Sequence, residues 1–189
     1  MDELKERILR DGQVLEGNIL KVDAFLNHQV DSGLMKRVGE EFARRFAPLK
    51  PDKILTAEIS GIAPALQAGV ALDVPVVFAR KMRPITMPKD AFERHVPSRT
   101  KGGETLLLVS PEYLHPKERV LVIDDFLATG QTLNALANIV VEARAQVLAF
   151  GVVVEKTFEH GREALEDWNV PLESLVVIER MTSKKIVFR

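Results

Sequence analysis

The chain has 189 residues, 46% of them apolar, and its 26 basic and 27 acidic residues nearly cancel. A chain of this length can bury a core of its own as a single domain. The balanced charge gives no whole-chain electrostatic reason to expect nucleic acid or an acidic membrane as the main partner. There is no cysteine, which excludes disulfides, thiolate metal sites and a thiol nucleophile.

Two helices are expected near the amino terminus. Residues 2–10 and 32–46 have apolar side chains at spacings of three and four, with Asp2 and Ser32 as candidate caps. The first residues mix charges with isolated apolar positions, unlike a signal peptide, and no stretch of 18 uninterrupted apolar residues follows. We therefore expect a cytoplasmic protein with no membrane partner.

Short apolar runs alternate with helical patterns along the rest of the chain. Strands are expected over residues 53–58, 74–80, 104–110, 119–125 and 145–156, and two more around a polar turn within 174–189. Helices are expected over residues 61–73, 130–145 and 162–169. Strands that are apolar on both faces suit a parallel sheet. The predicted fold class is therefore α/β, an open, mainly parallel twisted sheet flanked by helices in one domain over residues 1–189.

Residues 80–105 do not fit this alternation. They hold three acids against seven basic residues, which are Arg80, Lys81, Arg83, Lys89, Arg94, Arg99 and Lys101. Long irregular intervals inside a compact domain tend to be lids or disordered. A solvated hairpin that happens to be basic is the plainer interpretation, and a mobile lid over an anionic substrate is the more specific one.

Residues 120–132, VLVIDDFLATGQT, are the most informative stretch of the sequence. In an open α/β sheet, ligands bind outside the carboxyl ends of the strands, which is where Asp124 and Asp125 fall. The backbone N–H groups of residues 128–132 then point into a turn at a helix N-terminus, an arrangement that binds phosphate. The acids would repel phosphate but suit sugar hydroxyls or a magnesium ion, so the pattern predicts a phosphorylated sugar as ligand.

The side chains of the same turn agree with this interpretation. Gly130 allows the backbone to approach a ligand closely, and the hydroxyls of Thr129 and Thr132 can donate to phosphate oxygens. Alternatively, the acids are solvated loop residues and one of the threonines caps the helix. Neither the P-loop nor the dinucleotide-binding glycine pattern occurs in the chain.

The stretch VLVIDDFLATGQT resembles the ribose 5-phosphate signature of the type I phosphoribosyltransferases, which use phosphoribosyl pyrophosphate (PRPP). The stretches LKVDAFLNHQVD, ISGIAPA, VPVVFARK and GVVVEKTFEHGRE look like those of the bacterial xanthine phosphoribosyltransferases, in order and with similar spacing. The resemblance covers nearly the whole chain and is least clear from about residue 84 to 105. It implies a base-binding hood over about residues 1–50 and an α/β core over about 51–189, with residues 80–105 as a lid.

The resemblance also implies roles for individual residues. Asp124 and Asp125 would hold the ribose hydroxyls, and the 5-phosphate would be held by Ala128, Thr129, Gly130, Gln131 and Thr132. The turn over residues 58–65 would bind pyrophosphate with an unusual backbone geometry, for which the Ser60–Gly61 peptide is the candidate, aided by Arg80 and Lys81. Xanthine would be bound by Leu20, Asn27 and Lys156.

The residues proposed to bind the base are ambiguous when considered one by one. A lysine that closes an apolar strand, as Lys156 does, is usually solvated, although a cation there would favour an oxopurine over adenine. Asn27 could equally form a turn, and Leu20 could belong to the core. Phe126, directly after the acids, could stack on the base or pack inside.

The activity implied is purine salvage, in which xanthine and PRPP give xanthosine monophosphate and pyrophosphate. Mg²⁺ would be carried mainly by PRPP, without dedicated protein ligands, and a homodimer is expected. Hypoxanthine-guanine and adenine phosphoribosyltransferases remain alternatives. A PRPP-sensing regulator without catalysis is a further one, but residues 1–50 hold nine basic and nine acidic residues, which leaves no basic helix for DNA.

Overall fold

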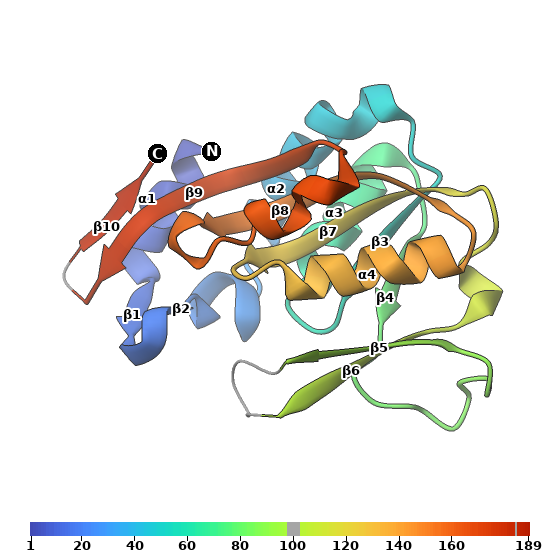
Figure 1. Ribbon diagram of the computed structural model, residues 1–189. Coiled ribbons are helices and arrows are strands. Elements are labelled where there is room, and N and C mark those ends of the chain that lie inside the picture. The colour runs from blue at the N-terminus through green and yellow to red at the C-terminus, as the bar shows by residue number, and fades with distance from the viewer. Residues whose placement is uncertain (98–102, 184) are drawn as a thin grey trace.

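The computed structural model describes residues 1–97, 103–183 and 185–189. Its centre is a six-stranded sheet (Figure 1) with the strand order β10 (Lys185–Phe188), β9 (Leu172–Thr182), β8 (Gln146–Lys156), β7 (Arg119–Leu127), β3 (Lys53–Ala57) and β4 (Val76–Ala79). All neighbouring pairs are parallel except β10 with β9. This confirms the predicted fold class and the pair of strands expected near the carboxyl terminus.

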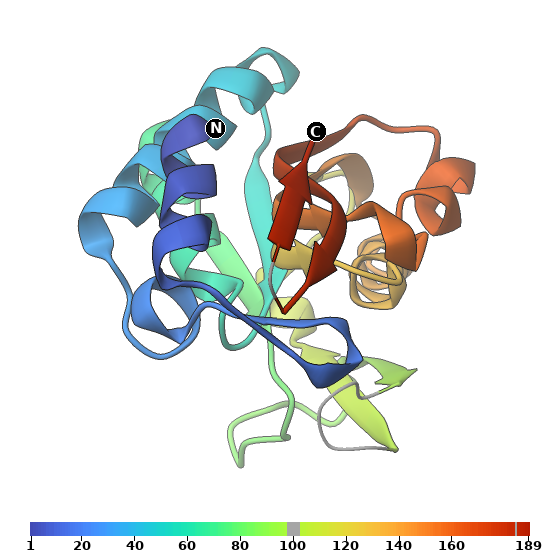
Figure 2. The ribbon, with the colours of Figure 1, turned by 90° about the vertical axis from the view of Figure 1, so that its left-hand side faces the viewer.

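Helices cover both faces of the sheet (Figure 2). One face carries α1 (Asp2–Asp11), α2 (Ser32–Phe46) and α3 (Ile62–Leu72), and the other carries α4 (Gln131–Glu142) and the 3₁₀ helix η6 (Glu163–Trp168). Phe42 and Phe46 are buried in the first of these cores, and Phe150 is buried in the second. The predicted helix over residues 162–169 thus forms as a 3₁₀ helix.

The first two helices begin differently from the prediction. The carboxylate of Asp31 accepts a hydrogen bond from the backbone N–H of Leu34 at 3.0 Å, so Asp31 caps α2 and Ser32 is already helical. α1 has no side-chain cap, because Met1 precedes it and donates its terminal ammonium to the carbonyl of Leu175 at 2.7 Å. The α1 helix is therefore fixed at its start by a contact with β9 that no local pattern reveals.

A small unit follows α1 and leads towards the sheet. β1 (Gln13–Leu15) and β2 (Ile19–Lys21) pair antiparallel across the 3₁₀ turn η1 (Glu16–Asn18), and a π-helical turn η2 (Asp23–Asn27) comes next. The remaining short helices are η3 (Ala47–Leu49), η4 (Pro111–Tyr113) and η5 (Thr157–Glu159). Among the described residues, no helix is long and apolar enough to cross a membrane.

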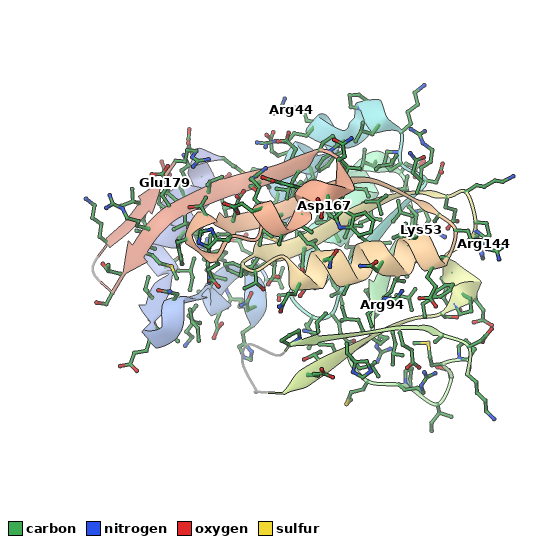
Figure 3. The ribbon with its side chains drawn as sticks, viewed as in Figure 1. Arg44, Lys53, Arg94, Arg144, Asp167 and Glu179 are labelled. Carbon is green, nitrogen blue, oxygen red and sulfur yellow. The ribbon has the colours of Figure 1, made fainter. Side chains whose placement is uncertain are left out.

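The strand over residues 104–110 forms, but its expected place in the parallel sheet is wrong. β6 (Glu104–Val109) pairs antiparallel with β5 (Phe92–Pro97) as a separate hairpin. Leu107 and Val109 are buried on the side of α4, and Arg94 forms an ion pair with Glu142 of α4 at 2.6 Å; Figure 3 shows Arg94 between the helix and the hairpin. The hairpin's apolar side chains thus pack against α4 rather than between sheet strands. Arg99, Lys101 and Gly102 of the basic interval lie outside the described residues.

Candidate functional site

A cavity of about 300 Å³ opens at the carboxyl ends of β3, β7 and β8. All the residues predicted for the site except Arg80 line it. They come from segments that are far apart in the sequence, including β2, the turn after β3, the turn after β7 and the end of β8. The fold therefore brings the predicted groups to one place.

The two adjacent acids stand near the carboxyl end of β7, which continues to Leu127. Asp124 is 6% exposed, and its Oδ1 accepts a hydrogen bond from the backbone N–H of Asp125 at 3.0 Å. Burial, and then the neighbouring charge of Asp125, raise the pKa of Asp124 well above its ordinary value. Two neighbouring carboxylates repel each other when both are charged. Hydroxyl donors or a cation would be needed to stabilise the doubly charged pair.

The turn over residues 128–132 joins β7 to α4. Gly130 has a φ of 78° and precedes the first residue of α4, which receives no side-chain cap. The threonines therefore do not cap this helix, contrary to the alternative considered for them. The N–H groups at the first turn of an α-helix have no partner within the helix, and here they face the same cavity as the two acids. This geometry supports the predicted phosphate cradle.

The turn after β3 lines the same cavity. The peptide bond between Glu58 and Ile59 is cis, so the unusual peptide is not Ser60–Gly61 as expected. A Cβ placed on Gly61 would lie 2.7 Å from Oδ1 of Asp124 and 2.4 Å from Oγ1 of Thr56. Only a glycine fits here, because any side chain would push into the buried acid.

Arg80 is placed away from the cavity. Its Nε donates to the carboxylate of Glu58 at 2.9 Å, and the backbone N–H of Lys81 donates to the same carboxylate at 2.5 Å. Glu58 lines the cavity, as does Lys81. The sequence analysis included Glu58 in the pyrophosphate turn but gave its side chain no role of its own, although its position directly after an apolar strand, like that of the two acids, marks it as a site candidate.

The other end of the cavity collects side chains from three segments. Lys156, the last residue of β8, is 6% exposed; its Nζ donates to the carbonyl of Asn18 at 2.8 Å and lies 5.3 Å from the ring centroid of Phe126. Leu20 is 4% exposed, whereas Asn27 is exposed at the end of η2. An aromatic ring, a cation and an amide thus border one space, which suits a flat polar ring.

The β5–β6 hairpin, which overlaps the interval predicted as a lid, supplies a further wall of the cavity. Four of its residues line the cavity, namely Val96, Pro97, Thr105 and Leu107. Residues 92–97 and 104–109 of this region therefore pair as a hairpin, but it is not merely solvated as the plainer interpretation expected, since it borders the cavity. β6 was expected as a strand, but β5 lacks the strong periodicity that identifies strands in a sequence, so the pairing of the two could not be predicted.

The donor set suits a metal ion that a ligand carries with it. Among the residues that the structure describes, no group of three or more His, Cys, Asp or Glu side chains could hold an ion. Asp124 and Asp125 provide hard carboxylate oxygens of the kind Mg²⁺ prefers, and this ion usually keeps only one or two protein carboxylates. The remaining positions would have to come from ligand oxygens or water.

Known proteins resemble this chain along its length. Residues 28–180 match the family model described as phosphoribosyl transferase domain. A protein from Deinococcus deserti named xanthine phosphoribosyltransferase is 52% identical over 96% of this chain and 94% of its own length. Another of that name, from Leuconostoc mesenteroides, is 47% identical over the whole of both chains.

Solved structures resemble the fold. An adenine phosphoribosyltransferase from Thermoanaerobacter pseudethanolicus superimposes with a TM-score of 0.76 at 23% identity, covering 93% of this chain and 98% of that one. The enzyme from Giardia lamblia in complex with 9-deazaadenine gives 0.78 at 18% identity, covering 94% and 98%. At these identities the likeness concerns the fold alone.

Proposed function

We infer that the chain, which belongs to the phosphoribosyl transferase domain family, transfers the 5-phosphoribosyl group of PRPP to xanthine, giving xanthosine monophosphate and pyrophosphate. One observation carries the chemical part of this inference. An acid pair, of which Asp124 is buried, and the turn over residues 128–132 at the start of α4 share one cavity with a lysine beside an aromatic ring. The relatives that match the chain over its full length carry the choice of base, because their names specify xanthine.

The sugar phosphate is proposed to bind at the end of β7. The backbone of Ala128, Thr129, Gly130, Gln131 and Thr132 would hold the 5-phosphate, while Asp124 and Asp125 would accept hydrogen bonds from the ribose hydroxyls. The raised pKa of Asp124 supports this role, because hydrogen bonds to the charged form would offset the repulsion between the two acids. The sugar is then held with its anomeric carbon towards the base end of the cavity.

The pyrophosphate is proposed to lie along the turn after β3. Ser60, Gly61 and Lys81 line that side of the cavity. The assignment of Arg80 to this group requires its side chain to leave Glu58, which it contacts at 2.9 Å. Because the guanidinium of Arg80 is paired with Glu58, Lys81 is the better supported of the two basic residues as a pyrophosphate ligand.

The base is proposed to bind between Phe126 and β2. The ring of Phe126 offers a stacking face, Leu20 an apolar edge, and Asn27 both a donor and an acceptor. Lys156 would give up the carbonyl of Asn18 and donate to an oxygen of xanthine. A cation at this place favours an oxopurine, because adenine presents an amino group there.

The chemistry needs no covalent nucleophile from the chain. Displacement at the anomeric carbon develops positive charge on the sugar, so the site must fix the ribose, neutralise the leaving group and exclude water. The acid pair and the cradle fix the ribose, and the hairpin wall with Val96 and Leu107 limits access of water. We propose that Mg²⁺ enters with PRPP and neutralises pyrophosphate charge.

A homodimer working in the cytoplasm is the proposed form of the protein. Large apolar side chains are exposed near the edge strand β4, with Ile59 and Met82 each 75% exposed and Phe78 39% exposed. Exposed apolar groups that lie close together commonly mark an interface. Light scattering should give twice the mass of the chain, and a monomer would contradict this proposal.

A turnover assay with PRPP, Mg²⁺ and one base at a time tests the function. Xanthine should give the highest kcat/KM, with guanine and hypoxanthine below it and adenine lowest. A preference for adenine would contradict the proposed role of Lys156. Binding of PRPP without turnover of any base would favour a PRPP-sensing regulator instead.

A further inference from the structure

Behind the phosphate-binding turn lies a second turn that lines no part of the cavity. It runs from the end of β8 through η5 to residue 162, and its Gly161 is buried. A Cβ on Gly161 would lie 2.2 Å from the carbonyl oxygen of Ala128 and 2.7 Å from Cδ1 of Leu127. The backbone of Gly161 therefore packs directly on the outer side of the phosphate-binding turn.

The contact is mutual. A Cβ on Gly130 would lie 2.7 Å from the carbonyl oxygen of Gly161 and 3.4 Å from its Cα. Two backbone segments thus touch at glycines, and at each glycine the nearest atom to the added Cβ is a backbone carbonyl oxygen. A shift of the outer turn by a fraction of an ångström would be passed on to the inner one, since packed interiors transmit strain.

An ion pair fixes the outer turn. Arg162 donates through Nε and Nη2 to the two carboxylate oxygens of Glu155, at 2.9 and 2.6 Å, and Glu155 is 2% exposed. Nη2 and Nη1 of the same guanidinium also donate to Oγ of Ser174, at 3.2 Å, and to the carbonyl of Leu172, at 3.3 Å. Arg162 directly follows Gly161, so these contacts link the turn both to Glu155 on β8 and to β9.

The lysine at the other end of the cavity has other partners: Nζ of Lys156 donates to the carbonyl of Asn18 at 2.8 Å and lies 3.6 Å from Oε1 of Glu159. Glu155 and Lys156 are neighbours on β8, so their side chains leave opposite faces of the strand. Lys156 faces the cavity and Glu155 faces away from it, towards Arg162. One eight-residue segment therefore begins beside the proposed base site and ends behind the proposed phosphate site.

We propose that Gly161, held in place by the Glu155–Arg162 ion pair, is a positioning residue that sets the backbone of the phosphate-binding turn from behind. The residue touches no ligand and acts through Ala128 and Gly130. The proposal rests on the proposed function for its ligand, a sugar 5-phosphate. It predicts a defect that is specific for the phosphate end of the cavity.

Gly161→Ala is the direct test. The added methyl group must displace the carbonyl of Ala128, and a misplacement of this size can cost about a hundredfold in rate. We expect the Kd of ribose 5-phosphate, measured by calorimetry, to rise at least about tenfold, together with the KM for PRPP. The KM for xanthine at saturating PRPP should change less than about threefold. Equal changes in both KM values would overturn the proposal.

Gly39→Ala is the matched control. It also introduces a steric clash in the interior, but at a residue that does not line the cavity. A Cβ on Gly39 would lie 2.3 Å from the carbonyl carbon of Gln67, which is as severe a clash but lies between α2 and α3. We expect this variant to lower Tm while leaving the Kd of ribose 5-phosphate within about threefold. If it weakens ribose 5-phosphate as much as Gly161→Ala does, the effect is one of stability and the proposal is wrong.

Arg162→Lys keeps the positive charge but loses the bidentate hydrogen bonding of the guanidinium to Glu155. It tests the ion pair even if Gly161→Ala does not fold. A weaker Kd for ribose 5-phosphate, by about threefold or more, is expected at an unchanged KM for xanthine, and an unchanged Kd would exclude a positioning role for the pair. Wild-type protein that binds ribose 5-phosphate but turns over no base would contradict the proposed function and leave this inference standing.

Discussion

The two ends of the cavity are built in different ways. The proposed phosphate end is made of the backbone of one continuous turn over residues 128–132, backed by another stretch of backbone at Gly161. The base end is made of side chains from β2, η2, β7 and β8. The phosphate end should therefore tolerate changes of side chain but not of backbone position, and the base end should show the reverse.

The acid pair stands between the two ends, and its removal should have the largest effect. Asp124→Asn combined with Asp125→Asn removes the proposed acceptors for the ribose hydroxyls. Hydrogen bonds to charged groups contribute about 1.5–3 kcal/mol each, so kcat/KM for PRPP should fall by more than about a hundredfold. Steady-state kinetics at saturating xanthine measures this. Unchanged kinetics would show that the pair is only a surface feature.

The same acid should lower the stability of the ligand-free protein at neutral pH. Burial raises the folded-state pKa of Asp124, so its neutral form is favoured by folding. This contribution is fully present below the unfolded pKa and is lost as pH rises through the folded one; each unit of difference is about 1.4 kcal/mol. Asp124→Asn should be more stable than wild type at pH 7 and equal to it below about pH 4. Urea unfolding across this range would show it, and a constant difference would contradict it.

Backbone and side-chain changes can be compared directly within the phosphate-binding turn. Gly130→Ala places a methyl group 2.7 Å from the carbonyl of Gly161 at a φ of 78°, and we expect the KM for PRPP to rise at least about tenfold. Thr132→Val keeps the shape and removes one hydroxyl, so a loss of about 1 kcal/mol or less is expected. If the valine variant proved the worse of the two, the turn would work through its side chains.

The base end should respond in the opposite way. Lys156→Met keeps most of the side-chain length and the contact with Phe126 but removes the cation. The ratio of kcat/KM for xanthine to that for adenine should fall about tenfold, because one charged hydrogen bond to the oxygen that adenine lacks is lost. The Kd of ribose 5-phosphate should stay unchanged. A parallel loss in ribose 5-phosphate binding would mean that the two ends are not independent.

Local patterns predicted much of the architecture and the turn that forms the proposed phosphate site. The α/β class, the strand that ends in the acid pair and the turn at Gly130 all depend on neighbouring residues, so they could be read from one stretch. The cap at Asp31 and the 3₁₀ form of η6 were missed, because they depend on details of one or two residues. The base residues were named from a family resemblance, and geometry alone would not have selected Leu20 or Asn27.

The sequence by itself determined the elements whose cause is local, such as apolar strands, amphipathic helices and the acid pair followed by a glycine turn. Only the tertiary structure decided that the β5–β6 hairpin packs on α4, that Glu58 takes up Arg80, and that Gly161 lies behind the phosphate-binding turn. The physical reason is that these contacts join residues separated by many positions, and their energy depends on shape complementarity that no pattern of residue types along the chain records.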